Sequence, residues 1–210
     1  MNWNVVCEIG SGAGQPLARV GLVADTHVPD RLDGLHPHLI PYLRDCQVER
    51  IFHLGDISGQ TVLDELSAVA PVIACLGNRD AAIRPRLPLV RYEEMAGVRF
   101  ALTHGHFGFL NYWVDKVRYV LQGYDPQRYL TKALVQAKGA DVVVFGHSHK
   151  MECLQVNGVY LVNPGAAGLG LRREIHATAG CVSIFPRGAV RIEIVEFTNA
   201  RLVGRRWEEG

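Results

Sequence analysis

The sequence lacks the features that mark several classes of protein. Its formal net charge is only +1 at pH 7, so no overall field favours nucleic acid or an anionic membrane as a partner. Its apolar runs, such as residues 142–145, are far too short to cross a bilayer. The first residues contain neither a basic stretch nor a long apolar stretch, which argues against a secretory signal. We therefore expect a cytoplasmic protein.

The cysteines are few, odd in number and widely separated, with no Cys-x-x-Cys pair. This pattern excludes a disulfide framework and a thiolate zinc site. We expect them to act as small hydrophobic side chains in a reducing compartment. They are Cys7, Cys46, Cys75, Cys153 and Cys181.

What is present suits one globular domain, because 48% of the 210 residues are hydrophobic and 20% are charged. We interpret residues 1–18, which include a glycine-rich stretch, as an N-terminal extension with room for one short strand. Residues 19–210 then form a single domain. A helical insertion is expected at about 107–138, where it would act as a lid, an interface or ordinary packing.

The first half of this domain alternates strands and helices. This order predicts parallel strands joined by right-handed crossovers. The expected strands are 19–24, 50–54 and 71–76, and the expected helices are 37–46 and 61–69. Polar residues follow each strand, at the edge where open α/β sheets bind ligands.

The second half is richer in strands, and several of them form hairpins. The expected strands are 89–93, 98–102, 142–145, 152–156, 159–162, 180–185 and 190–197. Two sheets that face each other, with helices outside each, account for the whole order. The sequence therefore predicts an α/β fold with two mixed sheets.

Five short polar motifs follow predicted strands. They are Asp25-Thr26-His27, Gly55-Asp56, Gly77-Asn78-Arg79-Asp80, His104-Gly105-His106 and Gly146-His147-Ser148-His149. Side chains two residues apart point the same way if the chain is extended, so both members of a pair can reach one ion. Mixed carboxylate, amide and imidazole donors at one sheet edge are what a two-metal hydrolytic site needs.

Each motif alone is typical of a turn or a cap, but the five in this order resemble a known family. The sequence resembles the calcineurin-like metallophosphoesterases, in particular the compact bacterial and archaeal phosphodiesterases related to the retromer subunit Vps29. The likeness covers about residues 19–197 and includes Asn163-Pro164-Gly165. It implies a four-layer α/β/β/α sandwich.

The resemblance also implies the roles of the metal ligands, with Asp56 as the bridge between two ions. One ion would be held by Asp25, His27, Asp56 and His149, and the other by Asp56, Asn78, His104 and His147. Imidazole-rich sites suit manganese, iron, zinc or nickel better than magnesium, and manganese is our first expectation.

One position departs from the family pattern, because Arg79 follows Asn78 where many members have histidine. Arginine does not release its proton near neutral pH, but it can offset charge on a phosphoryl group. Asp80 is expected to orient Arg79 through a salt bridge, and simple pairing of the two at the rim is the alternative. His106 is the candidate general acid. The candidate catalytic residues are Asn78, Arg79, Asp80 and His106.

The leading hypothesis is a dinuclear phosphoesterase that hydrolyses small phosphodiesters by in-line attack of a metal-bound hydroxide. The alternatives are a phosphomonoesterase and a Vps29-like protein-binding scaffold with little turnover. The expected partner is a small phosphate ester, with no membrane and no nucleic acid, and a homo-oligomer could form through the insertion. Outside the motifs, His53 is expected to be packed in the core, His36 to lie on the surface, and the basic tail 201–206 to be solvated or frayed.

Overall fold

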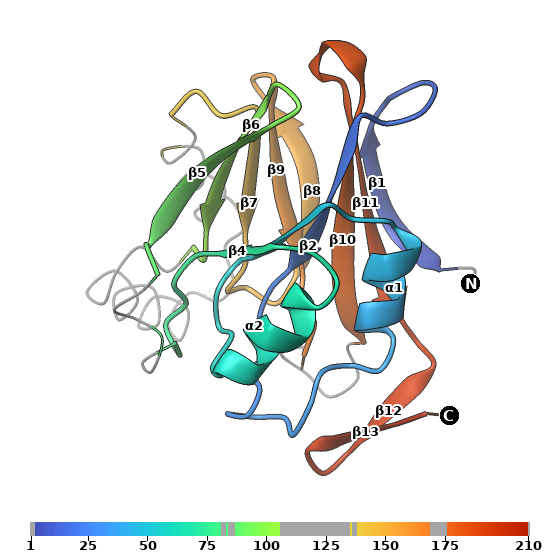
Figure 1. Ribbon diagram of the computed structural model, residues 1–210, viewed down its shortest axis with the longest axis vertical. Coiled ribbons are helices and arrows are strands. Elements are labelled where there is room, and N and C mark those ends of the chain that lie inside the picture. The colour runs from blue at the N-terminus through green and yellow to red at the C-terminus, as the bar shows by residue number, and fades with distance from the viewer. Residues whose placement is uncertain are drawn as a thin grey trace, which may run out of the picture.

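The computed structural model describes residues 3–80, 83, 87–105, 135, 138–168 and 176–209. Within these ranges the chain forms two α-helices, a short 3-10 helix (Pro186–Gly188) and thirteen strands (Figure 1). The helices are α1 (Leu39–Asp45) and α2 (Gln60–Ser67). The strands are β1 (Asn4–Gly10), β2 (Ala18–Val23), β3 (Arg50–His53), β4 (Val72–Ala74), β5 (Val90–Met95), β6 (Val98–Thr103), β7 (Val142–Phe145), β8 (Met151–Val156), β9 (Val159–Pro164), β10 (Ala177–Ile184), β11 (Val190–Phe197), β12 (Ala200–Val203) and β13 (Arg206–Glu209).

The first sheet has six strands in the order β1-β11-β10-β2-β3-β4. Strands β2, β3 and β4 are parallel, as the alternation of strands and helices predicts. Strands β1, β11 and β10 pair antiparallel and extend the sheet on the β2 side. Helices α1 and α2 lie on one face of this sheet (Figure 1).

The second sheet has five strands in the order β5-β6-β7-β9-β8. Strands β6, β7 and β9 are parallel, while β5 and β8 pair antiparallel at the edges. The turn between β8 and β9 has positive φ at Asn157 and Gly158, which is the backbone that a two-residue hairpin turn requires.

Each central strand contributes side chains to two apolar layers, because successive side chains point to opposite faces of the sheet. Leu22 and Phe52 point between the sheets, where the Phe52 ring meets Phe100 edge-to-face at 5.2 Å between centroids. Val23 and Ile51 point the other way and pack with α1 and α2. Two mixed sheets face to face, with helices on the first, confirm the predicted fold class. The prediction of a fourth, helical layer concerns residues outside the described ranges, as does most of the insertion expected at 107–138.

The N-terminal segment contributes more than a short strand beside the domain. Strand β1 pairs with β11 and forms the edge of the six-stranded sheet. Cys7 lies on this strand, and all five cysteines are free thiols. None of the described helices is long and apolar enough to span a membrane.

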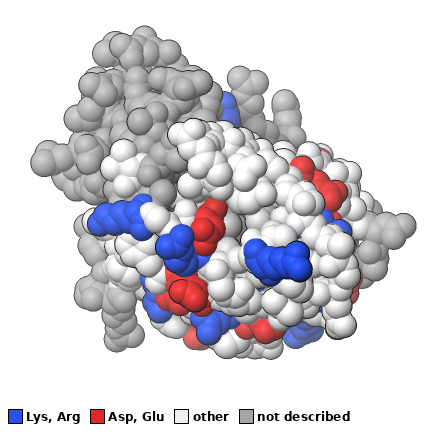
Figure 2. Space-filling model, turned by 90° about the horizontal axis from the view of Figure 1, so that it is seen from above, with Lys and Arg blue, Asp and Glu red and all other residues white. Residues whose placement is uncertain are grey.

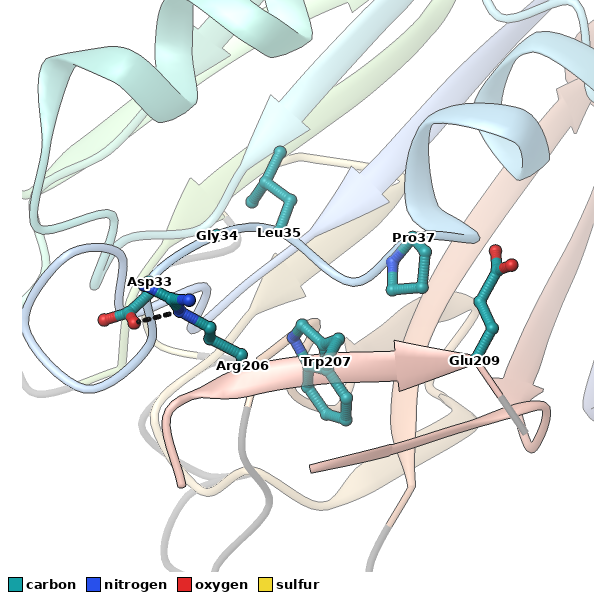
Figure 3. A pocket seen from close by; sticks show the side chains of 7 residues that line it. All are labelled: Asp33, Gly34, Leu35, Pro37, Arg206, Trp207 and Glu209. Carbon is teal, nitrogen blue, oxygen red and sulfur yellow. Dashed lines mark hydrogen bonds and ion pairs between the residues drawn. The ribbon is translucent and has the colours of Figure 1, made fainter. Parts of the chain in front are cut away.

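The arginines of the basic tail are exposed to solvent, as expected, but the described part of the tail is not frayed. Strands β12 and β13 form a hairpin, and the arginines of its turn pair with Asp33. A shallow pocket of about 440 Å³ lies between this hairpin and the loop before α1 (Figure 3). Its lining residues are Asp33, Gly34, Leu35, Pro37, Arg206, Trp207 and Glu209.

The expectation that His36 lies on the surface is wrong, because its side chain is only 1% exposed. Its ring stacks on Phe197 at 4.9 Å and meets Trp207 at 4.5 Å between centroids. The C-terminal hairpin supplies Trp207, so this segment covers a histidine that looked solvated in the sequence.

On the face seen in Figure 2, acidic and basic side chains of the described residues are interspersed, and these residues form no stripe of one sign.

Candidate metal centre

The predicted donors follow the carboxyl ends of parallel strands. Asp25 follows β2, Asp56 follows β3, and Asn78 follows β4 in the first sheet. His104 directly follows β6, and the pair His147 and His149 follows β7 in the second sheet. Because β2, β3 and β4 are parallel to one another, as are β6 and β7, these loops can meet where the two sheets face each other.

The backbone at these donors is left-handed, which differs from the extended geometry on which the Asp-x-His argument depends. Asp25, His27, Asp56, His147 and His149 all have φ between 54° and 72°. Such values are uncommon in residues other than glycine and persist only where surrounding structure fixes them. Here the loops hold each other, because the backbone N–H of Asp25 donates to Gly55 and that of His27 donates to Asp56. The side chains reach one place through these turns.

One set of donors consists of Asp25, His27 and His149, which we call the His27 half. His149 Nε2 lies 3.2 Å from Asp25 Oδ1 and 3.3 Å from His27 Nε2. All three side chains are buried. Asp25 Oδ1 accepts no hydrogen bond although it is fully buried, and such an atom is costly unless something else satisfies it. A carboxylate oxygen facing two imidazole nitrogens is a donor set that a transition-metal cation fits.

A second set consists of Asp56, Asn78, His104 and His147, which we call the His104 half. His104 Nε2 lies 3.4 Å from Asp56 Oδ1 and 3.1 Å from Asn78 Oδ1. His104 Nδ1 donates to the Leu54 carbonyl at 2.7 Å, which leaves Nε2 directed at these oxygens. The His147 ring meets the His104 ring edge-to-face at 5.0 Å.

Asp56 belongs to both halves by distance. Its Oδ2 lies 3.7 Å from His27 Nε2, while its Oδ1 faces His104. Asp25 also contacts both halves, because its Oδ1 lies 4.0 Å from His104 Nε2 and its Oδ2 accepts the backbone N–H of His147. The structure thus brings all seven predicted donors together, five of them buried and Asn78 and His147 half-buried, and His106 lies outside the described residues.

The electrostatics of the two carboxylates reflect this crowding. Burial alone would raise the pKa of Asp25, but the imidazoles of His149 and His104 outweigh it and lower the pKa. Burial likewise opposes ionisation of Asp56, and His104 and His27 hold the pKa of its carboxyl well below the usual range. Both groups are therefore carboxylates at neutral pH, the form that binds cations.

The pKa values of His27 and His104 are shifted in opposite directions. Burial lowers the pKa of His27 to about 4, so its imidazole is neutral at pH 7. Burial also disfavours the charged form of His104, but the Asp56 carboxylate beside it raises the pKa of His104 to about 9. Asp56 thus stabilises the protonated form of His104, although Asp56 and His104 would bind the same cation.

Asp80 does not pair with Arg79, and this prediction is wrong for a physical reason. The Asp80 side chain is fully buried, and its carboxylate accepts backbone N–H groups from Asp56, Ser58 and Gly77 at 2.7–3.0 Å. These bonds occupy both oxygens and join the loops after β3 and β4. Asp80 therefore positions Asp56 and does not orient Arg79.

Gly77 allows this close approach of the two loops. A Cβ atom on Gly77 would overlap the backbone nitrogen and the carboxylate of Asp56. Arg79 follows in the same loop, and its backbone N–H donates to Asp56 Oδ1 at 2.8 Å. The short Gly-Asn-Arg-Asp segment thus holds Asp56 at two points, through its backbone N–H and through its carboxylate.

Three residues that support the donors were not predicted as such from the sequence. Asp30 pairs with the Arg79 guanidinium at 2.7 Å. Asn163 donates to the Gly146 carbonyl and to Ser148 Oγ, which fixes the loop that carries His147 and His149. Thr26 accepts a hydrogen bond from the ring of the buried His53 and donates to the Ile57 carbonyl. Asn163 and Thr26 stand in motifs that the sequence showed, Asn163 at the end of β9 and Thr26 between two donors, while Asp30 carried no signal.

Comparison with known proteins assigns the class of protein that this fold and these donors define. The family model of the calcineurin-like phosphoesterase superfamily domain matches residues 19–184. The chain therefore belongs to the calcineurin-like phosphoesterase superfamily, as the five motifs predicted.

Individual relatives agree with this assignment. A probable metallophosphoesterase of Methanothermobacter thermautotrophicus is 32% identical over 147 residues, which cover 70% of this chain and 76% of that protein. A phosphodiesterase of Methanocaldococcus jannaschii is 25% identical over 160 residues, covering 70% and 82%. The structure of wild-type Vps29 from Entamoeba histolytica in complex with Zn²⁺ has a TM-score of 0.63 at 21% identity, over 86% of this chain and 99% of that one.

Proposed function

We propose that this protein is a dinuclear, metal-dependent phosphoesterase that hydrolyses small phosphodiesters. The observation that carries the proposal is the convergence of the two halves on Asp56, whose two oxygens face His27 on one side and His104 on the other. Two divalent cations held there would neutralise phosphate oxygens and lower the pKa of a water molecule, which would supply hydroxide as the nucleophile near neutral pH. Manganese is the first candidate, followed by iron, zinc and nickel.

The protein's own residues would orient the reacting groups. Asp25, His27, Asp56 and His149 would hold one cation, and Asp56, Asn78, His104 and His147 the other. The loops that carry them are fixed by Asp80 and by Asn163, which keeps the donors in place before substrate arrives. The Arg79 guanidinium, 41% exposed at the rim, would offset charge on the bound phosphoryl group.

We expect a preference for diesters because the described residues beside Asn78 in the sequence include no side chain that can give a proton to the leaving group. Arginine stands where a protonated histidine could assist the leaving group, and it does not release its proton near neutral pH. Esters with good leaving groups should therefore react best. The relative named a phosphodiesterase supports this preference. His106 remains the candidate acid for the monoester alternative.

The test is hydrolysis of bis-p-nitrophenyl phosphate beside p-nitrophenyl phosphate by protein stripped of metal and resupplied with Mn²⁺. We expect metal-dependent cleavage of the diester that Asp56→Asn abolishes. Asp64→Asn, which removes an exposed carboxylate on α2, is the matched control and should retain full activity. Faster cleavage of the monoester would favour a phosphomonoesterase, and no cleavage of either by metal-loaded protein would favour a scaffold.

A further inference from the structure

Asp30 lies between the rim and the interior of the metal centre. It follows His27 by three residues, and one oxygen of its carboxylate faces two donors. Asp30 Oδ2 lies 2.7 Å from Arg79 Nη1 and 3.9 Å from His27 Nδ1. The first distance is that of a short charge-assisted hydrogen bond, and the second is about 1 Å longer than an ordinary N–H···O hydrogen bond.

His27 has an unsatisfied nitrogen on its far side. Its Nε2 faces Asp25, Asp56 and His149, so the neutral ring that binds a cation through Nε2 carries its hydrogen on Nδ1. This Nδ1 is fully buried and has no hydrogen-bond partner. A histidine that binds a metal almost always donates its other N–H to a carboxylate, a carbonyl or water. Among the described residues, Asp30 supplies the carboxylate within 4 Å of this atom.

Arg79 holds Asp30 away from that position. The guanidinium and the carboxylate are both partly exposed, at 41% and 35%, so their ion pair is weak enough to exchange. The backbone of Arg79 is fixed by its hydrogen bond to Asp56, so its side chain can leave Asp30 without moving the loop. A rotation of the Asp30 side chain would then close the remaining gap to His27.

We propose that Asp30 is a positioning residue for His27 and that Arg79 competes for it. When Arg79 turns to a phosphoryl group, Asp30 accepts the N–H of His27 Nδ1 and fixes the imidazole for the cation. The phosphate ester and the cation in the His27 half then stabilise each other's binding, because linkage between two ligands is reciprocal. This inference rests on the proposed function for the identity of the anion, but its test measures metal binding and needs no turnover.

The test measures Mn²⁺ affinity of metal-stripped protein by competition with a chelating fluorophore. Asp30→Ala should weaken binding about 10-fold to 100-fold, the usual effect of removing such a partner. Asp33→Ala is the matched control, because it removes a carboxylate from the same loop that contacts only Arg205 and Arg206 among the described side chains. Asp30→Asn, which keeps an acceptor oxygen, should recover part of the loss. Melting temperatures measured without metal should be similar for all three variants.

Arg79→Gln separates competition from simple charge repulsion. It should tighten Mn²⁺ binding, and most of this gain should vanish in the double variant with Asp30→Ala, since the two residues then no longer compete. Equal affinities of Asp30→Ala and Asp33→Ala would overturn the inference, as would a gain from Arg79→Gln that persists fully in the double variant. If the wild-type protein hydrolyses the diester while these outcomes occur, the proposed function stands and only the role of Asp30 fails. Absence of Mn²⁺ binding by the wild type would overturn both.

Discussion

The two halves of the metal centre use the same kinds of side chain but hold protons differently. In the His27 half, burial keeps the His27 imidazole neutral by lowering its pKa to about 4. In the His104 half, Asp56 lies closer, at 3.4 Å from His104 Nε2 against 3.7 Å from His27 Nε2, and the pKa of His104 rises to about 9. A few tenths of an ångström do not explain the contrast alone, because His149 also faces His27 and lowers its pKa further.

This difference predicts in which half a cation must displace a proton in order to bind. In the His27 half the ring nitrogen already presents a lone pair at pH 7, so a cation displaces no proton from it. In the His104 half a proton occupies the place between an imidazole and a carboxylate, and a cation must displace it. The halves should therefore fill with different dependence on pH, although one carboxylate serves both.

The largest expected effect comes from removing one imidazole from either half. His149→Ala and His104→Ala should each reduce the bound metal from two ions to one, and diester hydrolysis should fall more than about 100-fold, since even indirect partners of a metal cost 10-fold to 100-fold. Elemental analysis and initial rates check this. The exposed His176→Ala should change neither. If one of the two variants retained both ions, the division into halves would be wrong.

The next effect is the contrast in pH dependence itself. His149→Ala leaves the His104 half, where Mn²⁺ affinity should rise about 10-fold per pH unit between pH 6.5 and 8.5, because one proton is released per cation bound. The sign follows from a pKa of about 9 for His104, since the ring is protonated throughout this range. His104→Ala leaves the His27 half, where His27 releases no proton in this range, so the slope of affinity with pH should be shallower. Equal slopes in fluorescence competition titrations would contradict the comparison.

The position of the donors could be predicted from the sequence, and their local geometry could not. Parallel strands place their carboxyl ends at one edge of the sheet. The sequence therefore predicts that the polar residues after these strands lie near one another, namely Asp25, Asp56 and Asn78. The left-handed backbone at Asp25 and His27 depends on hydrogen bonds to Gly55 and Asp56 in another loop. No local pattern specifies such contacts.

The partners of Arg79 and Asp80 show the same limit. Adjacent opposite charges suggest a pair, but three backbone N–H groups occupy Asp80 in the interior. Arg79 instead reaches Asp30, which is 49 residues away in the sequence. The arginines of the basic tail are solvated as expected, yet the hairpin that carries them is ordered, and its Trp207 packs against the buried His36. Tertiary contacts decided each case.

A smaller effect should follow from disturbing the carboxylate that both halves share. Gly77→Ala places a Cβ against the backbone and carboxylate of Asp56, and overpacking of this kind costs about 2 kcal/mol. The melting temperature should fall by about 4–8 °C for a chain of this size, and both cations should bind more weakly. Gly34→Ala is the control, because nothing lies within 4 Å of its added Cβ. Loss of affinity in one half only would show that Asp56 is not shared.

The smallest effect tests whether burial alone explains the neutral imidazole of the His27 half. His36 lies outside both halves, and burial lowers its pKa to about 4 as well. Its Nδ1 accepts the backbone N–H of His38, and its Nε2 is buried without a partner, so protonation would put an unpaired charge beside Phe197 and Trp207. The folded pKa lies below the unfolded value, so stability is fully present above about pH 6.5 and is lost as the pH falls toward 4.

His36→Asn keeps an acceptor near the His38 N–H and removes this titration. The wild type should lose about 1 kcal/mol more than the variant between pH 7.5 and pH 5.5, because the unfolded chain takes up a proton that the folded chain refuses. Urea denaturation of metal-free protein at the two pH values measures this difference. If the variant loses as much stability as the wild type, then burial does not hold His36 neutral. The low pKa of His27 would then need a cause within the metal centre, and the contrast with His104 would rest on the arrangement of charges there alone.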